Sequence, residues 1–137
     1  MGLLKERNLV FLIAKNHVSL QMLLNGWFVQ DLFFEGGPDL VAIKGHVTAR
    51  IKIRYATKSD AGYTFSSGGQ QNKTFFELAE GSDFFVFVCV GKNRQPTGFY
   101  VFPHSKTPKV KAFLHTIGGP FPKYREFYDN WKALEWK

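Results

Sequence analysis

The hydrophobic and polar positions in the first third of the chain predict a helix followed by two strands. Apolar residues recur at helical spacing over residues 5–24, and Asn25-Gly26 follows them as a typical helix stop. Residues 27–34 form a largely apolar run that predicts a strand. The turn signal of residues 35–38 separates this run from a short apolar strand predicted over residues 39–43.

The strongest strand pattern lies at residues 48–57, after a tight hairpin predicted at residues 45–46. Successive side chains of a strand point to opposite faces, so a period of two separates two sets of residues here. One set is apolar and the other is cationic: Ile51, Ile53 and Tyr55 on one face, and Arg50, Lys52 and Arg54 on the other. We therefore expect a strand that is buried on one side and charged on the other.

The second half of the chain predicts two further strands between a loop and a helical tail. Residues 58–73 are polar and contain glycine, which predicts a surface loop, and a short helix is expected over residues 74–80. Residues 84–90 are continuously apolar, which is typical of a strand covered on both faces. A polar turn over residues 91–98 leads to a last strand over residues 99–102. The tail over residues 108–137 is expected to form two helical pieces, broken at Gly118-Gly119-Pro120, the second with a core-facing stripe of Phe127, Trp131 and Leu134.

The resulting order, α-β-β-β-α-β-β-α, predicts an α/β (α+β) fold with five strands flanked by helices. The length of 137 residues predicts one domain that covers residues 1–137. Its single cysteine excludes a disulfide framework and is consistent with a cytoplasmic protein. No secretion signal and no apolar segment of the roughly 18 residues that span a bilayer is recognisable, so we expect no membrane association.

The charge balance points to polyanionic partners. Eighteen Lys and Arg against eleven Asp and Glu give a formal net charge of +7. The excess is concentrated after residue 91, where nine basic residues face three acidic ones. A basic protein of this kind attracts nucleic acid, although charge also serves solubility alone.

Residues 37–57, GPDLVAIKGHVTARIKIRYAT, resemble the PD-(D/E)XK nuclease superfamily, whose members have a restriction-endonuclease-like fold. In that family a Pro-Asp begins the second strand, and a (D/E)-x-K on the third strand brings a carboxylate and a lysine to the same face. The two carboxylates hold a divalent metal, Mg²⁺ or Mn²⁺, while the lysine positions or activates the attacking water. The resemblance extends over most of the chain, from the first helix to the last strand. It implies that Pro38-Asp39 is the first half of the motif.

The second half of the motif is replaced. The (D/E)-x-K position reads Lys52-Ile53-Arg54, and the first helix has no acidic residue near residues 15–17. Asp39 alone would then remain as a metal ligand, and one carboxylate beside an ammonium is a poor site for a hard dication. We therefore expect no cofactor, unless metal ligands have moved elsewhere. The candidates for such migrated ligands are Glu35, Asp60 and Glu77.

Three functions follow from these observations and remain open. The first is a catalytically degenerate nuclease-like domain that binds DNA or another polyanion through Arg50, Lys52, Arg54, Lys58 and Lys73. The second is an active endonuclease, dependent on Mg²⁺ or Mn²⁺, with migrated catalytic residues. The third is an assembly subunit that binds a protein partner or a second copy of itself through aromatic residues at Tyr124, Tyr128 and Trp136. An unrelated α/β fold would leave the cationic set as a solvated strand face.

Overall fold

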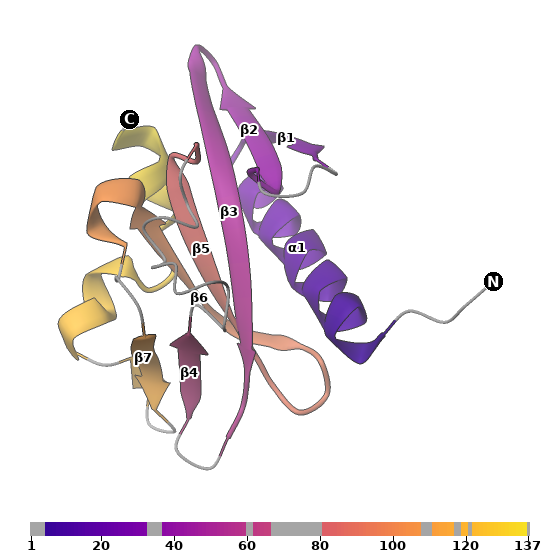
Figure 1. The fold of residues 1–137 in the computed structure, drawn as a ribbon. Coiled ribbons are helices and arrows are strands. Elements are labelled where there is room, and N and C mark those ends of the chain that lie inside the picture. The colour runs from indigo at the N-terminus through magenta and orange to yellow at the C-terminus, as the bar shows by residue number, and fades with distance from the viewer. Residues whose placement is uncertain are drawn as a thin grey trace.

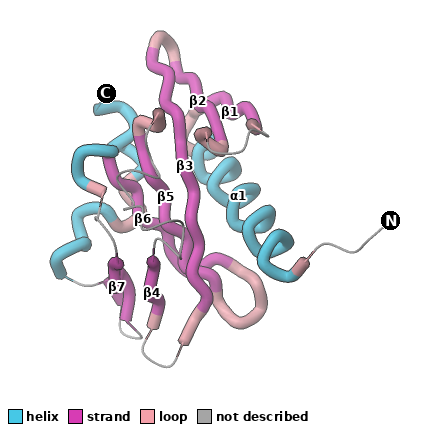
Figure 2. The backbone as a smooth tube through the Cα atoms, in the orientation of Figure 1, coloured by secondary structure: helices cyan, strands magenta, loops and turns pink. Residues whose placement is uncertain are grey.

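The computed structural model contains one long helix and a five-stranded mixed sheet (Figures 1 and 2). The structure describes residues 5–32, 37–59, 62–66, 81–107, 111–116, 119–120 and 122–136. The helix is α1 (Glu6–Leu24), and the strands are β1 (Phe28–Asp31), β2 (Leu40–Lys44), β3 (Val47–Thr57), β5 (Phe84–Val90) and β6 (Pro96–Pro103). Their order in the sheet is β1-β2-β3-β5-β6, with β3 and β5 parallel and all other pairs antiparallel. The predicted α+β fold with a five-stranded mixed sheet is thus confirmed.

The centre of the sheet is formed by β3 and β5. All seven residues of β5 are buried, because β3 and β6 flank the strand and side chains cover both of its faces. Cys89 lies in this strand, and burial raises the pKa of its thiol to about 12. A thiol protonated at neutral pH is a poor nucleophile and metal ligand, so Cys89 acts as a small core residue.

One face of the sheet packs against α1, which runs beside β1, β2 and β3 in Figure 1. Val10, Ala14, Val18 and Met22 recur along one side of the helix and are buried against alternate residues of the strands. The predicted apolar face of β3 belongs to this core: Ile51 and Ile53 are buried, and Tyr55 packs against its edge.

The opposite face is covered by aromatic side chains along β5 and β6. Phe85 and Phe87 stack with ring centroids 4.5 Å apart, and Phe102 meets Phe87 edge to face at 5.5 Å. Phe102 also packs against Phe127 of the 3-10 helix η2 (Pro122–Phe127), with ring centroids 4.4 Å apart. The C-terminal segment therefore closes this part of the sheet.

The C-terminal segment continues around the free edge of β6. The amide of Asp129 donates to the carbonyl oxygen of Phe99 at 2.7 Å, and Tyr128 forms a β-bridge with Tyr100. Beyond this edge, the 3-10 helix η3 (Trp131–Trp136) buries Trp131 and other residues in the α1 core. The C-terminal segment thus occupies the middle of this sheet edge, at Phe99 and Tyr100.

Two predictions for the second half of the chain are wrong. The predicted loop of residues 58–73 contains β4 (Tyr63–Ser66), which pairs with β7 (Lys111–Thr116) where a helical piece was predicted. β8 (Gly119–Pro120) pairs with β7 in turn, forming a second sheet of order β4-β7-β8. Proline and glycine on either side of the β7 segment leave too few residues for a stable helix. Pairing with β4 instead provides hydrogen-bond partners for the backbone N–H and C=O groups of β7.

The remaining differences concern element bounds and the type of helix in the tail. β1 is shorter than predicted, and β6 begins at Pro96 inside the predicted turn. A 3-10 helix, η1 (His104–Lys106), follows β6, and the tail forms the short 3-10 helices η2 and η3 in place of an α-helix. The predicted stripe of Phe127, Trp131 and Leu134 is buried as expected. The helix predicted over residues 74–80 lies outside the described residues.

Among the helices in the described part of the chain, none combines the length and the apolar character needed to cross a membrane.

Candidate nucleic-acid interface

The cationic face predicted for β3 is present in the structure. Arg50 is exposed, Lys52 and Arg54 are half-buried, and Ile51 and Ile53 between them are buried in the α1 core. The pleat of β3 thus places the three basic side chains on the face opposite α1. Lys58 is exposed just beyond the end of β3, where its amide donates to the carbonyl oxygen of Val90. Lys73, the fifth predicted contact, lies outside the described residues.

Asp39 lies directly before β2 and continues the hydrogen bonding between β2 and β3. Its amide donates to the carbonyl oxygen of Ile51 at 2.7 Å. Its carboxylate oxygen Oδ2 accepts the amide of Ile53, also at 2.7 Å. The side chain therefore substitutes for a strand partner two residues beyond the last β2–β3 pair, Leu40 with Ile51. This contact brings Asp39 beside Lys52 and Arg54, the two residues that the sequence analysis aligned with (D/E)-x-K.

The electrostatics of Asp39 reflect its burial among cations. Burial raises the pKa of its carboxyl group above the ordinary 3.8, although the charges of Lys52 and Lys15 and the hydrogen bond from Ile53 all act to lower it. The ammonium of Lys52 donates to the carbonyl oxygen of Gly37, 3.1 Å away. Burial lowers the pKa of the Arg54 guanidinium, while the charge of Asp39 opposes that shift. Asp39 thus lies among the positive charges of Lys52, Arg54 and Lys15, with the carboxylate of Asp31 as a nearby negative charge that raises its pKa further.

Lys15 belongs to the group of charged residues around Asp39, which also contains Lys52 and Arg54 and is called the Asp39 cluster below. The sequence analysis did not single it out as functional. It is buried on α1, where its ammonium pairs with the carboxylate of Asp31 and donates to the carbonyl oxygen of Leu32 at 2.9 Å. Both partners are at the end of β1, next to Asp39, since the amide of Leu32 donates to the carbonyl oxygen of Asp39. Where the resemblance implies an acidic residue from the first helix, this chain therefore buries a lysine.

Asp83 is the second residue that the sequence analysis missed. It directly precedes β5, and its Oδ2 accepts the amide of Arg50 at 2.8 Å. The Arg50 guanidinium contacts the same carboxylate at 3.3 and 3.4 Å. Asp39 and Asp83 thus bond to the backbone of β3 from its two sides, one toward β2 and the other toward β5. Half of the Arg50 side chain, 51%, stays exposed despite this ion pair.

These residues do not fit a divalent metal. Mg²⁺ and Mn²⁺ need several oxygen ligands, whereas Asp39 shares its surroundings with Lys52, Arg54 and Lys15. Asp31, the next carboxylate, is paired with Lys15. Within the residues that the structure describes, no group of three His, Cys, Asp or Glu side chains could hold a metal. The three candidates for migrated ligands, Glu35, Asp60 and Glu77, lie outside the described residues.

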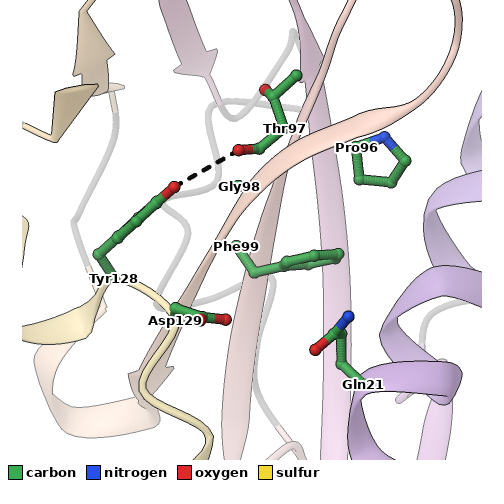
Figure 3. A pocket seen from close by; sticks show the side chains of 7 residues that line it. All are labelled: Gln21, Pro96, Thr97, Gly98, Phe99, Tyr128 and Asp129. Atoms are coloured by element: carbon green, nitrogen blue, oxygen red, sulfur yellow. Dashed lines mark hydrogen bonds between the residues drawn. The ribbon is translucent and has the colours of Figure 1, made fainter. Parts of the chain in front are cut away.

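A pocket of about 250 Å³ lies away from this cluster, between α1, the start of β6 and the C-terminal segment (Figure 3). Its walls include Gln21 of α1, Phe99 of β6 and Asp129, and the hydroxyl of Tyr128 donates across it to the carbonyl oxygen of Thr97 at 3.4 Å. The Asp129 carboxylate accepts the indole N–H of Trp131 at 2.8 Å. The Tyr128 hydroxyl thus connects the tail to β6, while the Asp129–Trp131 hydrogen bond lies within the tail.

Two of the three aromatic residues predicted to bind a protein partner, Tyr124 and Tyr128, are partly buried. Tyr124 and Tyr128 pack against the aromatic cluster of β5 and β6, with the Tyr128 ring centroid 5.1 Å from that of Tyr100. The side chain of Trp136 lies outside the described part of the structure. Both described tyrosines therefore attach the tail to the sheet.

Comparison with known proteins identifies the fold. No protein-family model matches the sequence, and no curated protein matches it in sequence. The structure is similar to the bacterial homing endonuclease I-Ssp6803I, with 18% identity, a TM-score of 0.65, and coverage of 95% of this chain and 93% of that chain. It is also similar to Hjc, a Holliday junction resolvase from Archaeoglobus fulgidus, with 11% identity, a TM-score of 0.50, and coverage of 89% and 93%. The chain has the restriction-endonuclease-like fold.

The three residues that the sequence analysis aligns with the PD-(D/E)XK motif are neighbours in this structure. The Asp39 side chain accepts the amide of Ile53, which lies between Lys52 and Arg54 along β3.

Proposed function

We propose that this chain is a catalytically degenerate domain of nuclease fold that binds DNA through a cationic surface. The surface comprises Arg50, Lys52, Arg54, Lys58 and Lys73. One observation carries the proposal: the carboxylate of Asp39 bonds to the backbone of β3 between two cations, Lys52 and Arg54. Phosphate is an anion that such a group of side chains attracts, and no metal is needed for the contact.

The expected binding mode is electrostatic and largely independent of sequence. Arg50 and Lys58 are exposed and can reach phosphates directly, while the half-buried Lys52 and Arg54 contribute positive potential between them. Each neutralised phosphate contributes a slope of about −0.9 to the dependence of log affinity on log salt concentration. Binding should therefore weaken steeply between about 50 and about 200 mM salt.

The test measures the affinity of a fluorescent DNA duplex for one double variant and for one single control variant, each of which removes positive charge. Arg50→Gln with Lys58→Gln removes two proposed phosphate contacts, and Lys132→Gln removes an exposed charge of η3, whose buried residues belong to the α1 core. We expect the double variant to weaken binding at least about tenfold and to reduce the salt slope by about two, with Lys132→Gln close to wild type. Thermal melts establish that all variants fold. Equal affinities, or a wild-type protein that binds neither duplex nor single-stranded DNA at low salt, would overturn the proposal.

Loss of catalysis is tested separately on supercoiled plasmid with Mg²⁺ and with Mn²⁺. We expect no cleavage by the wild-type chain with either metal. Asp39→Asn is the informative variant, because its amide oxygen keeps an acceptor for the Ile53 amide while the charge is lost. Cleavage by the wild type that disappears in this variant would establish the active-nuclease alternative, with ligands supplied from other positions.

A further inference from the structure

The open face of the sheet exposes an aromatic side chain beside the cationic surface. Phe28 of β1 is 68% exposed and lies directly across from Ile43 of β2, which is 40% exposed. Its chain neighbours behave differently: Trp27 is buried, and Val29 packs against the α1 core. Phe28 therefore points away from that core, to the face that carries Arg50.

The strand register fixes the position of Phe28 relative to Arg50. Ile43 is paired with Thr48 of β3, and Arg50 lies two residues further along the same face. With strands about 4.8 Å apart and a rise of about 3.3 Å per residue, the Cα atoms of Phe28 and Arg50 are roughly 12 Å apart. Val41, half-buried and paired with Arg50, lies between them on the same face. An apolar platform is thus continuous with the first cation of the surface.

We propose that Phe28 and Ile43 form a stacking platform for unpaired bases, so that single-stranded nucleic acid binds this surface in preference to duplex. The inference rests on the proposed function, because Arg50 and its neighbouring cations would hold the backbone of the same strand. Bases of a duplex are stacked on one another and hide their faces, whereas unpaired bases stack on exposed aromatic rings. A positive groove combined with an aromatic side chain is the arrangement that single strands require.

The charge of the surroundings favours nucleic acid over a protein partner as the occupant. The platform is bordered by Arg50, with Lys52 and Arg54 further along β3, and the whole chain carries a formal net charge of +7. A second copy of this chain would bring the same positive charges to the contact, and their repulsion would oppose association. A nucleic acid, in contrast, can contact the cations with its phosphates and the apolar platform with its bases.

The test measures the affinity of a fluorescein-labelled oligothymidine and of a duplex of equal length. Phe28→Ala removes the platform, and Leu24→Ala is the matched control, because Leu24 is 71% exposed at the end of α1. We expect Phe28→Ala to weaken oligothymidine binding at least about fivefold, with little change for the duplex, and Leu24→Ala to alter neither. Phe28→Trp should restore the wild-type affinity for the oligothymidine, because a larger ring stacks equally well.

Arg50→Gln separates failure of this inference from failure of the proposed function. It should weaken both oligothymidine and duplex binding, because phosphates are common to the two. If it does so while Phe28→Ala matches Leu24→Ala on oligothymidine, the platform is refuted and polyanion binding stands. If neither probe binds the wild type, both proposals fail. Size-exclusion chromatography that finds a dimer dispersed by Phe28→Ala would assign the platform to a second copy and overturn the inference.

Discussion

The sheet face opposite α1 has two halves with opposite properties. Over β5 and β6 it is closed, with Phe85, Phe87 and Phe102 buried beneath the C-terminal segment. Over β1, β2 and β3 it presents exposed or half-buried residues, including Phe28 and Arg50. The same pleat runs through both halves, since Lys52 is paired with Phe85 and Arg54 with Phe87. The boundary between core and surface thus lies between two adjacent strands.

This difference separates stability from binding within one face. Aromatic side chains in the closed half are shielded from water and packed against one another until the chain unfolds, so they stabilise the fold. Phe28 in the open half has little area to lose, and its removal should leave the fold unchanged. Among the described residues, Lys52 and Arg54 lie on β3 next to this boundary. Substitutions on the two sides should therefore affect different measurements.

The largest expected effect is that of Phe87→Ala in the closed half. Phe87 is fully buried and contacts the rings of Phe85 and Phe102. Removing the ring should lower the free energy of unfolding by about 3–5 kcal/mol, from lost burial and the cavity left behind. Urea denaturation monitors the change, with Phe28→Ala as the matched aromatic deletion, expected to cost less than about 0.5 kcal/mol. Similar costs at both positions would mean that the two halves are equally packed.

A smaller effect is expected at the edge of the closed half, where Tyr128 lies against Gly98. A Cβ atom at position 98 would lie 2.8 Å from Cε1 and 3.0 Å from the hydroxyl oxygen of Tyr128. Gly98→Ala should therefore displace the tyrosine and cost about 1–3 kcal/mol of unfolding free energy. In a Tyr128→Ala background the same substitution meets no ring, so its cost should fall. A cost that persists there would place the conflict in the backbone of β6.

The sequence was sufficient to predict the strands whose burial leaves a regular pattern of apolar residues within the strand. The alternation over residues 48–57 and the apolar run over residues 84–90 correspond to β3 and β5 because burial imposes those patterns directly. The strands β4 and β7 were missed, because each is stabilised by pairing with a segment about fifty residues away. Short polar or mixed segments of this kind have no periodicity that distinguishes them from a loop or a helix.

The cluster around Asp39 was predicted only in part, for a similar reason. The resemblance to a nuclease motif identified Asp39, Lys52 and Arg54 by their spacing on two neighbouring strands. Lys15 and Asp83 belong to no local motif, and they reach the same strands through the packing of α1 and the start of β5. A lysine among the apolar residues of an otherwise amphipathic helix was the one available signal, because a buried ammonium requires a partner.

The smallest expected effect is the pH dependence contributed by Asp39 in the open half, on the β2 side of β3. Because burial raises the pKa of this carboxyl group above 3.8, the folded chain binds more protons than the unfolded chain between 3.8 and the raised pKa. Stability should therefore fall as pH rises through this window and stay lower at neutral pH. Asp39→Asn carries no such charge, so at pH 7 it should be at least as stable as wild type, and the two should converge below pH 3.8.

Asp39→Ala distinguishes the charge of this side chain from its hydrogen bond. It also removes the charge, but it leaves the Ile53 amide without its carboxylate acceptor, at a cost of about 1–3 kcal/mol. Urea denaturation of the three proteins across the acid range measures both quantities. If Asp39→Asn were destabilised at pH 7 as much as Asp39→Ala, the attraction of Lys52 and Lys15 would outweigh the burial of the charge. The cationic cluster would then stabilise the fold through Asp39, and the open half of the sheet would share in the stability assigned here to the closed half.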